Sequence, residues 1–351
     1  MFNKFSLVAA LLNAGLLISS AYVHASAFHT GELLFAQPNW DYSPSAMVDW
    51  DGKTKVWWCG EEGGRDVIKY REKSPGGVWS AEIKVLESNR FIPGKAPLSW
   101  EGVFVCDPTV TRGSWSYLGA HYSYVMYYTT EHPWSSSVGG QDNRIGLAFS
   151  NNGIHWTKYE SGPVIDDGLT GTYGTGQSVV WSVSAGAGVR TVYTFVDSIG
   201  AIHYYYRESV DGISFGPRSE ITQAGLTLNG SPGLSHRSPA IAFAPAAHSG
   251  RYYYYMANVC ETYADSPYGL AWGTGKGVCV YRIDGNFLFT GTWERVLESG
   301  HIKPVEVEPG FLTNLYGNIQ DDWPNITLNF GCSGAGDPLS WEICWAQGVA
   351  K

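Results

Sequence analysis

The sequence is poor in charged residues and has no excess of positive ones. Charged side chains make up 16% of its 351 residues, and the net charge is −9, whereas about 25% charged residues is usual. Nucleic acids and anionic lipid surfaces are recognised by clustered Lys and Arg. We therefore expect neither a nucleic-acid ligand nor an anionic membrane surface as a partner.

Long apolar runs are missing after the N-terminal region. Near the start, "LVAALLNAGLLISSAYV" follows Lys4 and precedes "VHASA", which is typical of a signal peptide cut after Ala25 or Ala27. A transmembrane anchor is the alternative, although the run is short for a bilayer span. We expect residues 1–27 to be a signal peptide, residues 28–351 to form the mature protein, and the location to be secreted or periplasmic, without a membrane anchor after cleavage.

The sequence has no Cys-x-x-Cys pair and no cluster of His and Cys, so a zinc thiolate site is not expected. Its six cysteines are an even number, which after export favours disulfides, and six cysteines allow fifteen pairings. Proximity in the chain favours the pairs Cys59–Cys106, Cys260–Cys279 and Cys332–Cys344.

No linker rich in Pro or Ser divides the chain, which favours a single domain. The chain instead contains an internal repeat. Five related segments, "SPSAMVDW", "DPTVTR", "QSVVWS", "SPAIAFAP" and "WPNITLNF", have their second residues at positions 44, 108, 178, 239 and 324. Proline is compatible with the first residue of a strand, so the four segments that contain it predict the start of one, and "QSVVWS" is a weaker copy that lacks proline.

Each repeated segment precedes a second strand rich in aromatic residues, such as "KVWWCG" or "YVMYYTT", and most precede a third and a polar fourth strand. Four antiparallel strands repeated five times predict a five-bladed β-propeller; a β-sandwich would not require this period. The segment "GELLFAQ" belongs to no unit, and the fifth unit ends soon after its second strand. We therefore expect the N-terminal strand to complete the last blade and close the ring.

In a propeller the first strand of each blade lines the central channel, so the residues before these strands converge on one pocket. They are Trp40, Asp41, Asp107, Gln177, His236, Arg237, Asp321 and Asp322. The loops after the second strands share this end and add Glu61, Glu62, Glu131, His132, Asp197, Glu261 and Tyr263. Carboxylates beside aromatic rings suit glycoside cleavage, which needs one acid and one base or nucleophile. The alternatives are that Asp41 and Asp107 cap turns and that Trp40 belongs to the core.

The segments "CDPTVTR", "NRIGLAFSNNGIHWTKY" and "HRSPAIAF" resemble the five-bladed β-propeller glycoside hydrolases, a group that includes arabinanases, arabinofuranosidases, β-xylosidases, invertases and levansucrases. The resemblance implies an Asp on the first blade as base or nucleophile, an Asp on the second that tunes it, and a Glu on the third as acid. Asp41 corresponds to the first, with an offset because Ser43 stands before Pro44, and Asp107 corresponds to the second. The third position holds Gln177, which cannot donate a proton as a general acid, so Glu261 or Glu131 is expected to supply it.

The sequence thus predicts a secreted glycoside hydrolase, or a glycosyl-transferring relative, that acts on poly- or oligosaccharide. The predicted catalytic residues are Asp41, Asp107 and Glu261, and the predicted sugar contacts are Trp40, Gln177, His236, Arg237 and Asp322. A carbohydrate-binding, lectin-like propeller is the alternative that Gln177 favours, and a structural propeller would predict apolar residues before the first strands. We expect a monomer and no cofactor apart from a possible structural Ca²⁺ at Asp321 and Asp322, although no EF-hand motif is present.

Overall fold

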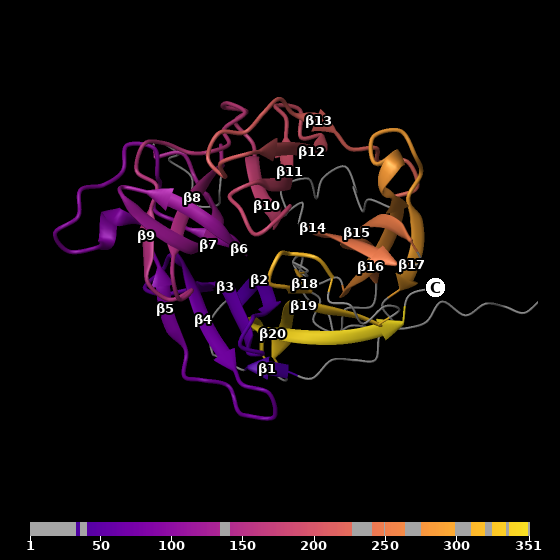
Figure 1. The fold of residues 1–351 in the computed structure, drawn as a ribbon, viewed down its shortest axis with the longest axis horizontal. Helices are drawn as coiled ribbons and strands as arrows, with labels where there is room; N and C mark the ends of the chain where they lie inside the picture. Colours follow the sequence, from indigo (N-terminus) through magenta and orange to yellow (C-terminus); the bar gives the residue numbers. More distant parts are fainter. Residues whose placement is uncertain are drawn as a thin grey trace, which may run out of the picture.

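The chain is built almost entirely from β-strands, as its repeated apolar segments predict. The structure, a computed structural model, describes residues 33–35, 41–133, 141–226, 241–248, 250–263, 275–298, 310–319, 325–334 and 337–349. In this part of the chain the strands form four sheets arranged around a central axis (Figure 1). The predicted all-β propeller architecture is therefore confirmed.

Three of the sheets are four-stranded antiparallel meanders, in which each strand pairs with the next along the chain. The first contains β6 (Cys106–Tyr117), β7 (Ala120–Thr130), β8 (Arg144–Ser150) and β9 (Trp156–Lys158). The second contains β10 (Gly174–Ser182), β11 (Val189–Val196), β12 (Ile202–Ser209) and β13 (Ser219–Glu220). The third contains β14 (Ile241–His248), β15 (Arg251–Tyr263), β16 (Gly275–Asp284) and β17 (Glu294–Glu298).

The fourth sheet has eight strands, in the order β1-β20-β19-β18-β2-β3-β4-β5. These strands are β1 (Leu33–Phe35), β20 (Asp337–Val349), β19 (Asn325–Gly334), β18 (Gly310–Asn314), β2 (Asp41–Val48), β3 (Thr54–Glu61), β4 (Asp66–Lys73) and β5 (Ile83–Leu86). The prediction of five separate blades is wrong in number, because β18 and β2 pair in parallel and join their two groups of strands into one sheet. Inner strands run in the same direction around a propeller axis, so neighbours that approach closely can share a parallel ladder. At the outer edge of this sheet, β1 pairs antiparallel with β20.

The structure also corrects the predicted start of the fifth unit. The segment "WPNITLNF" was expected to be an innermost strand, but residues 325–330 belong to β19, which pairs with β18 on one side and β20 on the other. The inner position is taken by β18, whose sequence "GFLTN" lacks the repeated pattern. The step from position 239 to 324 is long because it includes this additional strand.

Hydrophobic layers between neighbouring groups of strands hold the ring together. Consecutive side chains of a strand point to opposite faces, and here both faces are buried. In β7, Met126 and Tyr128 pack against β2–β5, while Val125 and Tyr127 pack toward β10–β12. In β3, Trp57 and its neighbours are all fully buried, which explains why these strands read as continuous apolar runs rather than alternating ones.

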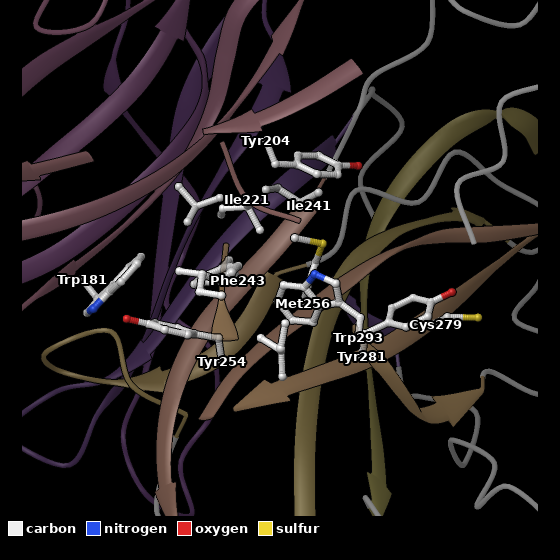
Figure 2. Packing of buried hydrophobic residues seen from close by; sticks show 13 residues of the cluster. Trp181, Tyr204, Ile221, Ile241, Phe243, Tyr254, Met256, Cys279, Tyr281 and Trp293 are labelled. Carbon is white, nitrogen blue, oxygen red and sulfur yellow. The ribbon is translucent and has the colours of Figure 1, made fainter. Parts of the chain in front are cut away.

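Figure 2 shows the layer between β10–β12 and β14–β16, where Trp181 stacks on Phe243 with ring centroids 5.4 Å apart. Burying one such side chain stabilises a fold by about 1.5–3 kcal/mol before conformational entropy is subtracted. Each layer therefore holds two neighbouring groups of strands together.

Helical structure is limited to two 3-10 turns in the described residues, Asn89–Phe91 and Gly285–Phe287. In that same part of the chain, no helix has the length and hydrophobicity required to cross a membrane.

Candidate functional site

Five inner strands surround a pocket on the propeller axis. Its lining consists of residues 43–46 of β2, 107–110 of β6, 177–179 of β10, 241–243 of β14, and 310, 311 and 313 of β18, with Gly317 beyond them. The open space between these strands is about 590 Å³, including the part continuous with solvent. Four of the five repeated first strands, β2, β6, β10 and β14, therefore converge as expected, and β18 takes the fifth position.

Three of the inner strands share an unusual backbone feature at the pocket. Ser43, Asp107 and Gln177 have positive φ angles of 51°, 46° and 47°, a region that residues other than glycine rarely adopt. At each of them the register with the next strand shifts, as a β-bulge requires. Bulges redirect a side chain, and strained backbone concentrates at functional sites. The three positions are thus structural equivalents in three successive repeats.

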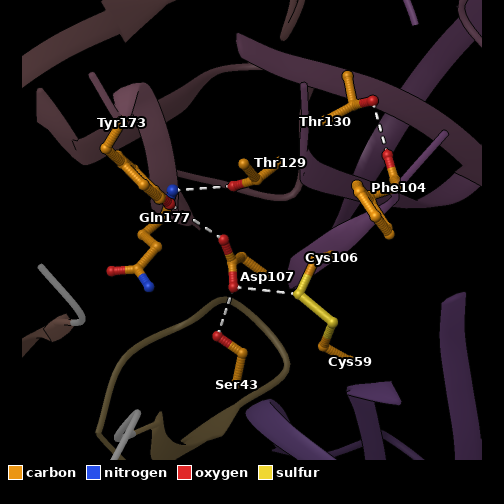
Figure 3. The surroundings of a disulfide bond; sticks show 9 residues. All are labelled: Ser43, Cys59, Phe104, Cys106, Asp107, Thr129, Thr130, Tyr173 and Gln177. Atoms are coloured by element: carbon orange, nitrogen blue, oxygen red, sulfur yellow. Dashed lines mark hydrogen bonds between the residues drawn. A yellow bond between two sulfur atoms is a disulfide. The ribbon is translucent and has the colours of Figure 1, made fainter. Parts of the chain in front are cut away.

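Asp107 is the charged member of this set. The Ser43 Oγ donates a hydrogen bond of 2.6 Å to Asp107 Oδ1, and the Tyr173 hydroxyl donates one of 3.2 Å to Oδ2 (Figure 3). Burial raises the pKa of Asp107, while hydrogen bonds from Ser43, Thr129 and Tyr173 act in the opposite direction. The site therefore holds a carboxylate that is shielded from water but surrounded by hydroxyl donors.

The other two bulges carry neutral side chains. Gln177 is buried, and its backbone N–H donates a 2.9 Å hydrogen bond to Thr129 Oγ1. Thr129 thus links Gln177 to Asp107, with which it also forms a side-chain hydrogen bond. Neither the Ser43 hydroxyl nor the Gln177 amide can act as a carboxyl acid or base at neutral pH.

Ser178, next to Gln177, adds a buried hydroxyl to the pocket lining. Its side chain is only 2% exposed, and its Oγ makes no hydrogen bond to another described residue. Buried hydroxyls are normally satisfied, so this oxygen, unpaired among the described residues, is an unusual feature of the pocket wall.

A disulfide joins the wall of this pocket to the neighbouring strands. Cys59 on β3 and Cys106 on β6 are bonded with a Cα–Cα distance of 4.9 Å, which confirms the predicted pair. Cys106 directly precedes Asp107, and its Sγ lies 3.4 Å from Asp107 Oδ1 (Figure 3). The covalent link therefore fixes the start of β6 at the point where Asp107 enters the pocket.

The other predicted disulfides are described only in part. Cys279 is disulfide-bonded, but its predicted partner Cys260 has a side chain outside the described residues. The side chains of Cys332 and Cys344 also lie outside them.

Asp66 is a carboxylate that the sequence analysis missed. It is half-buried at the first residue of β4, and one of its carboxylate oxygens lies within 4.8 Å of the sulfurs of Cys59 and Cys106. Burial raises its pKa to about 6, a hydrogen bond from Tyr42 opposes this, and the nearby Asp107, Glu61 and Glu131 carboxylates raise it further. The sulfurs of Cys59 and Cys106 are bonded to each other in the disulfide. Asp66 and these two cysteines therefore do not form a thiolate metal site.

We predict that Asp66→Asn stabilises the protein in a pH-dependent manner. A folded-state pKa of about 6 against the ordinary 3.8 gives stability that is present below pH 3.8 and lost as the pH rises to 6. The variant should match the wild type near pH 4 and exceed its free energy of unfolding by up to about 3 kcal/mol at pH 7. Urea unfolding at pH 4, 5.5 and 7 measures this difference, and a difference that does not change with pH would contradict the pKa.

Asp41 lies away from the pocket. It is fully buried at the start of β2, and its Oδ1 accepts a 3.1 Å hydrogen bond from Lys69 Nζ, also buried. Burial raises its pKa, and the Lys69 charge opposes that rise. The structure therefore brings Ser43, not Asp41, to the position equivalent to Asp107.

The remaining predicted residues are less fully described. Glu261 lies on β15, but its side chain is outside the described residues, as are Trp40, His236, Arg237 and the acidic pair at 321 and 322. Glu131 is buried after β7, and its Oε1 accepts a 2.9 Å hydrogen bond from the Val103 backbone. Among the predicted catalytic and sugar-contacting residues, Asp107 and Gln177 are those that the structure brings together.

Comparisons with known proteins give matches at the level of the fold. No family model and no curated protein matches the sequence. An exo-1,5-α-L-arabinanase from a bovine ruminal metagenomic library has a similar structure, with a TM-score of 0.53, 14% identity, and coverage of 90% of this chain and 99% of that one. A thermostable family-43 glycoside hydrolase gives a TM-score of 0.57 at 12% identity, covering 92% and 96%. A GH62 hydrolase in complex with xylotriose gives 0.56 at 9% identity, covering 92% and 97%. The predicted resemblance to β-propeller glycoside hydrolases is thereby confirmed for the fold.

Proposed function

We propose that this protein is a glycoside hydrolase that cleaves an O-glycosyl bond of a poly- or oligosaccharide in the central pocket. The observation that carries the proposal is the alignment of three equivalent strained bulges, at Ser43, Asp107 and Gln177, around one pocket. Similar folds in an arabinanase and in a GH62 hydrolase with a bound xylo-oligosaccharide support a carbohydrate as the ligand.

The chemistry of the pocket suits a sugar. Ser45, Thr109 and Ser178 line it together with Phe243 and Phe311, so polar and apolar residues surround the space, as in sites for small polar ligands. Asp107, surrounded by donors, acts as the base or nucleophile. Gln177 acts as a neutral sugar contact, and the proton donor is a separate carboxyl group.

A second candidate function is carbohydrate binding without cleavage. The neutral side chains at two of the three equivalent bulges favour it, because an amide and a hydroxyl bind sugars but transfer no proton as carboxyl groups do. In this case Asp107 accepts hydrogen bonds from the ligand and performs no chemistry.

One experiment separates the two functions. The purified protein is incubated with a panel of arabinan, xylan, fructan and their oligosaccharides, while binding to the same glycans is measured by calorimetry. We expect reducing ends to be released from at least one glycan that binds. Binding with no product release would select the lectin-like function, and neither binding nor release would contradict both.

We also propose the finer features of the protein's organisation and location. The N-terminal strand β1 closes the ring by completing the eight-stranded sheet, a proposal supported by its pairing with β20. A single domain spans residues 28–351 and acts as a monomer. Residues 1–27 direct secretion, and the Cys59–Cys106 disulfide is in keeping with an oxidising compartment.

A further inference from the structure

We infer that Asp66 is the second carboxyl group of the reaction and supplies the proton that Gln177 cannot. The inference rests on the proposed hydrolase function and identifies its proton donor. Asp66 stands on a different element from Asp107, at the turn between β3 and β4, and the Cys59–Cys106 disulfide lies beside both residues.

The geometry limits the distance between the two carboxyl groups. An oxygen of Asp66 lies within 4.8 Å of Cys106 Sγ, and Asp107 Oδ1 lies 3.4 Å from the same sulfur. These two oxygens are therefore at most about 8 Å apart, an upper limit that is compatible with the separations of about 5–5.5 Å and about 6.5–9.5 Å that glycosidic cleavage uses. Asp41, by contrast, is fully buried and paired with Lys69.

The surroundings of the two groups assign the proton to Asp66. Asp107 accepts hydrogen bonds from hydroxyl groups, including that of Ser43, and these stabilise its charged form. Asp66 faces Tyr42 on β2, Glu61 on β3, Asp107 on β6 and Glu131 after β7.

Three of these four neighbours of Asp66 are carboxylates, so a second negative charge is unfavourable there. The pKa of about 6 places its proton within reach of neutral pH.

The reaction then balances with these two residues alone. As the bond from the anomeric carbon to the leaving oxygen breaks, its electron pair goes to that oxygen, which takes the proton from Asp66. A water oxygen bonds to the anomeric carbon, and the water proton passes to Asp107. The products are a free reducing sugar and an alcohol, and proton exchange with solvent returns Asp66 and Asp107 to their starting states.

The test compares two substrates of the same sugar in Asp66→Asn, chosen from the glycans that the wild type cleaves. An unactivated oligosaccharide needs a proton on its leaving oxygen, whereas a 2,4-dinitrophenyl glycoside does not. We expect kcat/KM to fall about 10²-fold or more for the oligosaccharide and less than about tenfold for the aryl glycoside. The alkaline limb of the wild-type pH profile should disappear in the variant.

Glu62→Gln is the matched control, since Glu62 is an exposed carboxylate in the same turn that pairs with Lys84. It should retain wild-type rates and the alkaline limb. Equal losses on both substrates in Asp66→Asn, or an unchanged alkaline limb, would overturn the assignment of Asp66 alone. A wild type that cleaves no glycan would overturn the hydrolase function and this inference with it.

A second measurement does not depend on turnover. Carbon-13 NMR titration of the Asp side chains should show Asp66 titrating well above its usual pH in the wild type and at lower pH in Asp107→Asn, because one neighbouring charge is gone. An Asp66 that titrates at the same pH in both proteins would refute the coupling between the two carboxyl groups.

Discussion

Asp107→Asn is expected to lower kcat/KM for glycan hydrolysis by more than about 10³-fold, with glycan affinity changed by less than about tenfold. Asn keeps the size and shape of the side chain and tolerates the positive φ of 46° found at this position. Ser43 and Tyr173 donate to different oxygens of Asp107, so in the variant one hydroxyl keeps an amide oxygen as its acceptor and the other can accept a hydrogen bond from the amide N–H. The change therefore removes the negative charge and basicity while leaving the pocket intact.

The control for this prediction is Asp51→Asn, an exposed aspartate in the turn after β2, at the opposite end of that strand from Ser43. It should leave hydrolysis and affinity unchanged. Initial rates and calorimetric titrations of both variants give the two quantities. Hydrolysis that persists in Asp107→Asn would remove Asp107 from the chemistry, and a parallel loss of affinity would make it a binding residue.

The repeated units could be predicted from sequence because four inner strands, β2, β6, β10 and β14, begin with related local patterns. The second residues at 44, 108 and 178 directly follow the three bulged residues, Ser43, Asp107 and Gln177. The number of sheets could not be predicted from sequence. It depends on the β18–β2 ladder, which joins residues about 270 positions apart and forms only if the two inner strands approach closely. The short β18 has too few residues to show a pattern of its own.

The site was predictable only where a residue's position in the repeat identified it. Asp107 and Gln177 precede their strands in the same way, and the structure places both in the pocket. Asp41 was chosen for its carboxylate, although Ser43 occupies the equivalent position. Asp66 was missed because its neighbours are set by tertiary structure. Asp66 begins β4, beside β3, and the signal in the sequence was the predicted bond between Cys59 of β3 and Cys106 of β6.

The Cys59–Cys106 disulfide gives the second prediction with a large effect. The double change Cys59→Ala and Cys106→Ala is expected to lower the free energy of unfolding by about 4 kcal/mol. The bond closes a loop over a sequence separation of 47 residues, and the loss of that constraint on the unfolded chain gives this magnitude. Alanine is preferred to serine because Cys59 is fully buried and a hydroxyl group would need a partner there. Chemical denaturation of the variant and the wild type at pH 7 measures the difference.

The variant tests the site as well as the fold. The disulfide joins Cys106, the residue before Asp107, to Cys59 on β3, and β3 is paired with β4, where Asp66 lies. Reducing agents cannot replace the substitution, since Cys279 is also disulfide-bonded and would be affected. Under conditions where the variant remains folded, we expect hydrolysis to fall more than glycan affinity, because proton transfer depends on the spacing of two carboxyl groups more strictly than binding does.

An unchanged free energy of unfolding would show that packing between the sheets fixes β6 without the bond. Unchanged hydrolysis in the folded variant would show that the spacing of Asp66 and Asp107 does not depend on the disulfide.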